Sequence, residues 1–422
     1  MKINKWTMGL AAVGLVSIPG AGLADEKLNP VLTSLTPTVI DGYVNVSAIW
    51  NPGTGNDRVP NYSFSKGKQD GFNLDVVKVS IGKSLDESQW SAGYKVDLLF
   101  GPDANALATG SASTVLPGTG GPDPDTALNN LSDFGIKQAY VAVRAPVGNG
   151  IDFKVGVWDT IIGYETFDAG SNPNYTRSYG YSIEPTTHTG VLASYQICKF
   201  ASVSVGVANT FGPMINQRSN PPKAESYKTY MAAAALTAPD DWGFLAGSTL
   251  YGGFINGFNS IGGGVDQVSY YAGVTLNTPI KALKVGFAFD YAGITDEGVV
   301  SDPGDGYPTV YANAIAGYLS FQATEKLSLH GRAEYATTDT GVLVSTDPAP
   351  PGYTSRVVAL TGTIQYDLWK NVLSRLEVRW DHQLAGNMVG YGGDTRDSSN
   401  STTKGSGTRD YVTVALNLIY KF

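Results

Sequence analysis

A two-residue alternation of apolar and polar side chains recurs along this chain and limits the fold more than any other feature. The clearest case is the C-terminal segment, whose apolar face carries Val412, Val414, Leu416, Leu418, Tyr420 and Phe422. Its other face carries Tyr411, Thr413, Ala415, Asn417, Ile419 and Lys421. Successive side chains of a β-strand point to opposite faces, so the segment predicts a strand with one apolar and one mostly polar face. Its length and aromatic ends match a tilted strand that crosses a bilayer.

About sixteen segments show this alternation, and the connections between them alternate between eight long loops and seven tight turns. Single-chain outer-membrane barrels have an even number of strands, long outer loops and short periplasmic turns. The sequence therefore predicts an all-β fold, a transmembrane antiparallel up-and-down β-barrel over residues 40–422. Because backbone groups in lipid need internal partners, we expect the first strand, near 40–50, to pair with the last. The Ala/Gly-rich strands, such as the one expected at 243–254, are the least clearly phased.

Composition agrees with a barrel and excludes several other classes. Charged residues make up 16% of the chain, whereas a typical soluble domain carries about 25%. No apolar run reaches the length of a transmembrane helix. A formal charge of -8 and a pI near 5.0 indicate that nucleic acid is not a partner. The single cysteine, Cys198, cannot form an internal disulfide.

The first 24 residues have the pattern of a cleaved signal peptide. Lys2 and Lys5 form a basic region, residues 8–18 an apolar region, and Gly22-Leu23-Ala24 a small-residue cleavage site. We expect an irregular leader at residues 25–39 to follow it. Together with the strand pattern, this predicts export to a bacterial outer membrane, with its lipid as a partner.

Charged side chains fall on the polar faces of many of these strands. A charge facing hydrocarbon would be costly, so these side chains must face water or pair with one another. The candidate pore-lining residues are Lys95, Asp97, Lys154, Arg332, Glu334, Arg375, Glu377, Arg379 and Asp381. The last four alternate in sign along one face. They fit either a mutually neutralising ladder that fixes register or a charged lining that creates a field across the pore.

The stretch from Gly156 to Gly190 carries the most specific motif. A Gly-x-Glu element, an Asn-Tyr-x-Arg-Ser segment and a Pro-x-x-His-Thr-Gly segment follow one another, with matches at Gly163, Glu165, Asn174, Tyr175, Arg177, Ser178, His188, Thr189 and Gly190. On these residues the chain resembles the β-barrel porin-2 (OmpL-like) family of bacterial outer-membrane porins. The resemblance implies a pore-forming protein and carries no substrate with it.

Within this stretch, residues 161–185 form a candidate constriction loop. Its candidate constriction residues are Tyr164, Glu165, Asp168, Tyr175 and Arg177. If the loop folds inward, carboxylates facing an arginine would narrow and polarise the lumen. Alternatively, Glu165 and Arg177 pair and anchor the loop to the barrel wall. The same residues serve both interpretations.

A barrel of about sixteen strands leaves an aqueous channel, which favours a porin for small hydrophilic solutes or ions. One alternative is a structural or adhesive barrel that acts through its outer loops. Another is an outer-membrane enzyme, which would need a nucleophile, a base and an orienting group. Only three histidines are present, and no Gly-x-Ser-x-Gly or His-Glu-x-x-His motif occurs. We therefore expect no enzymatic activity, no cofactor and no metal site. A homo-oligomer is compatible with the sequence.

Overall fold

The computed structural model describes residues 38–53, 70–107, 110–111, 134–215, 227–258, 266–295, 310–338, 355–385 and 408–422. The expected signal peptide, and the expected leader up to residue 37, lie outside these described residues. The first strand begins at Val39.

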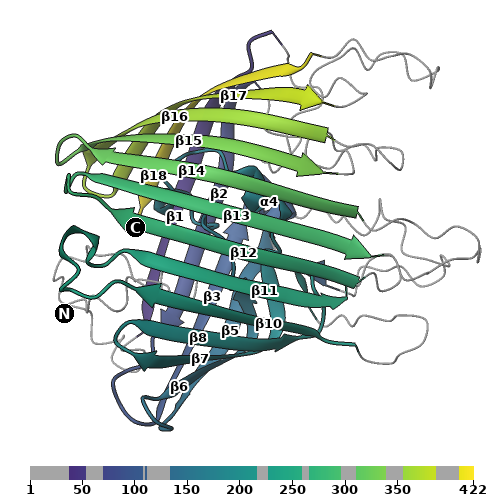
Figure 1. The fold of residues 1–422 in the computed structure, drawn as a ribbon, viewed down its shortest axis with the longest axis vertical. Coiled ribbons are helices and arrows are strands. Elements are labelled where there is room, and N and C mark those ends of the chain that lie inside the picture. Colours follow the sequence, from purple (N-terminus) through teal and green to yellow (C-terminus); the bar gives the residue numbers. More distant parts are fainter. Residues whose placement is uncertain are drawn as a thin grey trace, which may run out of the picture.

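Sixteen antiparallel strands form one closed barrel, as the sequence predicts (Figure 1). The strands are β1 (Val39–Trp50), β2 (Gly71–Lys83), β3 (Ser91–Phe100), β5 (Phe134–Ala145), β6 (Ile151–Asp159), β7 (Thr187–Cys198), β8 (Ala201–Ala208), β10 (Thr229–Thr237), β11 (Thr249–Phe258), β12 (Asp266–Asn277), β13 (Leu283–Thr295), β14 (Val310–Gln322), β15 (Leu327–Thr338), β16 (Ser355–Trp369), β17 (Val372–Ala385) and β18 (Asp410–Lys421). Each pairs with its sequence neighbour in the barrel, and β18 pairs with β1.

The seam between β1 and β18 closes the barrel. Ser47 lies opposite Asn417, and the register runs from Tyr43 opposite Lys421 to Trp50 opposite Val414. Beyond it, Gly42 and Phe422 exchange two backbone hydrogen bonds, each 3.0 Å long. This pairing satisfies the edges that an open sheet would expose to lipid, which is why the first and last strands were expected to meet.

The alternation separates the two faces of the barrel wall. On β18, Leu416 is 56% exposed on the outer face, whereas Asn417 beside it is 3% exposed and faces inward. Exposed aromatic side chains lie at strand ends, including Trp50, Phe100, Phe134, Trp369 and Phe422. This is the position of the interfacial girdle of outer-membrane barrels. No helix in the described part of the chain is long and apolar enough to cross a membrane.

One strand differs clearly from its predicted bounds. The strand expected at 243–254 begins at Thr249 instead, because Gly243–Leu245 forms the 3-10 helix η5. Gly243 has φ +62, a left-handed value that does not fit a strand. Ala238 and Ser248 close the turn, with the amide of Ala238 donating to the carbonyl of Ser248 at 2.7 Å.

A few short elements accompany the barrel. Helix α2 (Pro102–Leu107) follows β3, and β4 (Gly110–Ser111) pairs in parallel with β9 (Met214–Ile215). Two more elements, η4 (Ala169–Ser171) and α4 (Tyr179–Ile183), lie between β6 and β7. The long connection that contains them is the one described residue by residue below.

The seam generates a prediction about two glycines. A methyl group at Gly42 would overlap the backbone carbonyl of Lys78 and the ring of Phe422, whereas one at Gly362 meets nothing within 4 Å. We expect Gly42→Ala to lower the free energy of unfolding by about 1–3 kcal/mol through overpacking. Gly362→Ala should be neutral or stabilising, because alanine loses less backbone entropy.

Urea titration of the refolded barrel, followed by the gel mobility of unheated samples, measures both variants. If the two substitutions change the free energy of unfolding equally, close packing around Gly42 does not determine the stability of the closed barrel.

Candidate functional site

The connection from β6 to β7, residues 160–186, folds into the barrel and reaches the opposite wall. Helix α4, near its end, packs against β13, β14 and β15. Figure 1 shows α4 within the outline of the barrel. Earlier in the same connection, Asp168 contacts β2 through Lys78, and the carbonyl of Ala169 contacts β17 through Arg375. These residues therefore form a loop that crosses the lumen, called the lumen loop below.

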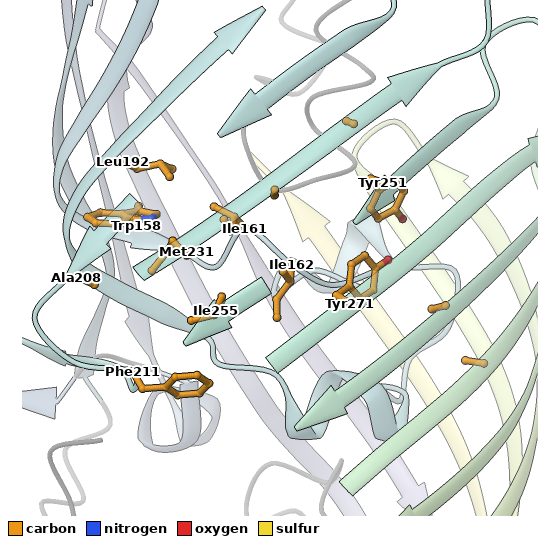
Figure 2. Close-up of a cluster of buried hydrophobic side chains, with 14 of the residues drawn as sticks. Trp158, Ile161, Ile162, Leu192, Ala208, Phe211, Met231, Tyr251, Ile255 and Tyr271 are labelled. Atoms are coloured by element: carbon orange, nitrogen blue, oxygen red, sulfur yellow. The ribbon is translucent and has the colours of Figure 1, made fainter. Parts of the chain in front are cut away.

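The loop begins in an apolar cluster. Ile161 and Ile162 lie among inward-facing side chains that include Trp158, Leu192, Phe211, Met231, Ile255, Tyr251 and Tyr271 (Figure 2). These side chains come from β6, β7, β10, β11 and β12 and from the residues after β8. Burial of such large side chains contributes about 1.5–3 kcal/mol each. The first turn of the loop is therefore held to one side of the lumen by packing.

Arg332 of β15 is the centre of the polar attachment on the other side. Its guanidinium binds Glu165 of the loop at 2.8 Å and Glu334 of its own strand at 2.6 Å. It also donates to the backbone carbonyls of Thr176 and Arg177, at 2.7 and 3.1 Å. One buried cation thus joins two carboxylates and two loop carbonyls, the arrangement that offsets the cost of burying an ion pair.

The alternating charges of β17 bind the same loop. Arg375 donates to the carbonyl of Ala169 at 2.9 Å, and Glu377 accepts from the amides of Tyr175 and Thr176 at 2.6 and 2.9 Å. Arg379 donates to the carbonyl of Arg177 at 2.7 Å and pairs with Asp381 at 2.9 Å.

These four β17 side chains are between 0% and 3% exposed. Their low exposure indicates that the lumen loop covers them. Arg379 and Asp381 pair with each other. Arg375, Glu377 and Arg379 bind the loop backbone, and Asp381 accepts from the hydroxyl of Tyr179.

A third attachment joins the loop to β2 and β3. Lys78 lies 2.7 Å from Asp168 of the loop and 3.3 Å from Asp97, and Lys95 lies 3.3 Å from the same Asp97. The side chain of Asp168 remains 40% exposed, in contrast to the fully buried Asp97. Asp168 is therefore a loop carboxylate that water can reach.

The remaining candidate residues either bind the backbone of the loop or join the loop to the barrel wall. Arg177 donates to the carbonyls of Thr166, Phe167 and Tyr175, at 2.9 to 3.1 Å. Tyr164 stacks on Tyr318 of β14, with ring centroids 4.0 Å apart. The hydroxyl of Tyr175 donates to Ser47 of β1 at 3.0 Å.

The motif residues of the sequence have physical roles in this docking. Ser178 caps α4 by accepting the amide of Tyr181 at 3.1 Å, and its own amide donates to Glu165 at 2.9 Å. Asn174 donates to Thr363 of β16 at 2.7 Å. A side chain at Gly190 would overlap the backbone of β8. The motif thus describes how the loop is attached.

The structure places the predicted site residues in three groups. Arg332, Glu334, Arg375, Glu377 and Arg379 meet Glu165 or the loop backbone, and Asp381 accepts from the hydroxyl of Tyr179. Lys95 pairs with Asp97, which also pairs with Lys78, the partner of Asp168. Lys154 lies apart from the loop, 4.8 Å from the centroid of the Tyr140 ring. Glu165 pairs with Arg332, which the sequence did not single out as its partner.

Three contributors were missed: Asn172, Thr176 and Glu184. The side-chain amide of Asn172 accepts from the amide of Thr166, and the hydroxyl of Thr176 donates to Glu377. Both residues lie in irregular loop, which leaves no periodic signal in the sequence. Within the described residues, no group of three or more His, Cys, Asp or Glu could hold a metal ion.

A closed sixteen-stranded barrel with a loop bound across its lumen defines a protein of the outer-membrane porin class. Residues 37–422 match the family described as "Putative beta-barrel porin-2, OmpL-like", and the chain belongs to this family. The resemblance stated from the loop motif is therefore confirmed, as are the predicted barrel and a porin channel role in the outer membrane.

Solved structures with the same fold have low sequence identity to this chain. An anion-selective porin from Comamonas acidovorans is 12% identical with a TM-score of 0.55, covering 91% of this chain and 99% of that one. In-vitro folded OmpT of Vibrio cholerae, in a trimer form, is 12% identical with a TM-score of 0.53, covering 91% and 99%. The outer membrane channel DcaP of Acinetobacter baumannii is 13% identical with a TM-score of 0.50, covering 91% and 97%. No curated protein sequence matches this chain.

The central arginine generates a prediction. Arg332→Ala leaves Glu165 and Glu334 buried without their main cation, so we expect the free energy of unfolding to fall by about 3–5 kcal/mol. The matched control is Arg144→Ala, because Arg144 and Asp152 form a partly exposed pair at the turn end of β5 and β6. Its loss should cost about 0–1 kcal/mol. Urea titration of both variants compares them, and an Arg332→Ala cost as small as the control would rule out a central role.

Proposed function

We propose that this chain forms a water-filled channel for passive diffusion of small hydrophilic solutes or ions, narrowed by the lumen loop. The observation that carries the proposal is the loop itself, which is fixed across a sixteen-stranded barrel by ion pairs to two separate wall regions. A barrel of this size leaves an aqueous interior. Water reaches side chains beside the loop, since Asp168 is 40% and Asp159 is 29% exposed.

We further propose that the water-accessible charges beside the loop set the ion preference. Glu165 and Arg177 are 6% and 3% exposed, and their contacts hold the loop in place. Asp168 shares Lys78 with Asp97 but keeps much of its carboxylate open to water. A charge in contact with the aqueous path acts on passing ions, whereas a buried and paired charge is largely neutralised. Among the predicted constriction residues, Asp168 is therefore the one that we assign to ion selection.

Export and assembly complete the proposal. The first 24 residues would direct export and be cleaved, which N-terminal sequencing of the outer-membrane protein can check. The trimer form described for OmpT supports a homo-oligomer here as well. Outer-membrane lipid would cover the apolar outer face.

An enzymatic role receives no support from His188 or His330, and His382 hydrogen-bonds Asp410 but no serine, threonine or cysteine among the described residues. His330 contacts Ser320 at 2.9 Å, but its other ring nitrogen has no hydrogen-bond partner to orient it. His188 is buried beside Thr160 and Trp158. A nucleophile and base need a third, orienting group, so we propose that the chain is not an enzyme. An adhesive role would depend on outer loops that lie outside the described residues.

Single-channel recording tests the channel. Purified, refolded protein in a planar bilayer under asymmetric salt should give stepwise conductance and a reversal potential that reports the ion preference. A folded barrel without conductance would contradict the diffusion channel and favour a structural or adhesive role.

The same recording tests the assignment of Asp168. We expect Asp168→Asn to shift the reversal potential toward anions, changing the permeability ratio by up to about fivefold, because a charge about 4 Å from an ion in water is worth about 1 kcal/mol. Asp152→Asn is the control, since Asp152 is similarly exposed and also pairs with one basic residue. Glu165→Ala and Arg177→Ala should mainly destabilise the loop. If they shift selectivity while Asp168→Asn does not, the assignment is wrong.

A further inference from the structure

Two carboxyl groups meet near the C-terminal end of the lumen loop. Glu184 caps the C-terminal end of α4, and Asp290 faces inward from β13, against which α4 packs. Their side chains share a hydrogen bond. Two loop glycines make room for them, because a side chain at Gly163 would overlap the Glu184 carboxyl and one at Gly180 would overlap that of Asp290. The loop is thus shaped around this pair.

Several lumen carboxylates have a cationic partner, whereas no such partner of this pair is found among the described residues. Asp97 pairs with Lys78 and Lys95, Glu165 with Arg332, and Asp381 with Arg379. Among the described residues, no Lys or Arg forms an ion pair with Glu184 or Asp290, and one Asp290 oxygen has no hydrogen-bond partner.

The groups that face the pair from neighbouring elements are acidic or neutral. Tyr271 of β12 lies directly across from Asp290, and Tyr251 of β11 lies next to Tyr271. Glu165 from the loop and Glu334 from β15 add negative charge. Tyr318 of β14 is neutral, and Arg332 of β15 is already bound to Glu165 and Glu334.

Two adjacent carboxyl groups without a cation cannot both ionise easily, so they hold one proton between them. Burial raises the pKa of Glu184 well above its usual value, and the adjacent Asp290 carboxyl raises it further. The shared proton makes the hydrogen bond between α4 and β13. Loss of that proton would replace the bond by repulsion between two carboxylates.

We propose that the Glu184–Asp290 pair is a proton-dependent latch that fastens the α4 end of the lumen loop to β13. The latch is intact while the pair holds its proton and is lost as the pH rises through the pair's own titration. Only this end of the loop is released, because the rest is held by arginines that stay charged at every working pH, by the Lys78–Asp168 ion pair and by the apolar packing of Ile161 and Ile162. The inference that this latch regulates the constriction rests on the proposed channel function.

Single-channel currents between neutral and alkaline pH test the latch. In the native chain, the frequency of current fluctuations should rise about tenfold per pH unit below the titration midpoint, because one proton controls release. Asp290→Asn cannot lose a proton and can still hydrogen-bond Glu184, so its fluctuations should be independent of pH. Asp152→Asn, remote from the loop, should keep the native pH profile. A native-like profile in Asp290→Asn would overturn the proposal.

Infrared spectroscopy during a pH titration tests the latch independently of whether the pore conducts. The carbonyl band of a protonated carboxyl should persist at neutral pH in the native barrel and disappear in Glu184→Gln and in Asp290→Asn. Absence of the band from the folded native protein would overturn the latch even if the pore conducts. Presence of the band in a barrel that does not conduct would support the latch and contradict the proposed channel.

Discussion

Backbone hydrogen bonding in lipid is the constraint on which the rest of this structure depends. The hydrocarbon core offers no water to a free amide or carbonyl, so each strand edge must be paired and the sheet must close on itself. Closure through Gly42 and Phe422 fixes which side chains face lipid and which face the lumen. Charges on β15 and β17 are therefore directed into the interior, where each must find water or a partner.

The lumen loop supplies many of those partners, and the two sides of its attachment differ in kind. Near β7 to β12 it is held by apolar packing that begins at Ile161, which has little directional preference. Near β15 and β17 it is held by guanidinium groups that bind loop carbonyls at fixed positions. Packing brings the loop to the lumen side of the wall, and the arginines specify its path. A buried ionic network of this kind specifies one conformation of the loop more reliably than it adds to the free energy of unfolding.

The barrel could be predicted from the sequence because it follows from a period of two, which every strand repeats. The sequence predicts that strand β11 begins at Gly243, but it begins at Thr249. Gly243 has a left-handed backbone and lies where alanine and glycine weaken the apolar alternation. The loop was recognised as a site from its charges, but its partners were not. Glu165 and Arg332 are separated by 167 positions, and their meeting depends on the loop path, which no local pattern encodes. Glu184 carried no signal because its significance comes from Asp290, 106 positions later.

The loop has a consequence for the order in which the molecule can be assembled. It lies near the middle of the chain, yet its polar partners are on strands from the last quarter and near the start. Contacts of such long sequence separation form late, because the intervening chain must first be ordered. Until β15 to β17 are in place, Glu165 and the loop carbonyls have no arginine to meet. The narrowing of the lumen is thus a final event of assembly.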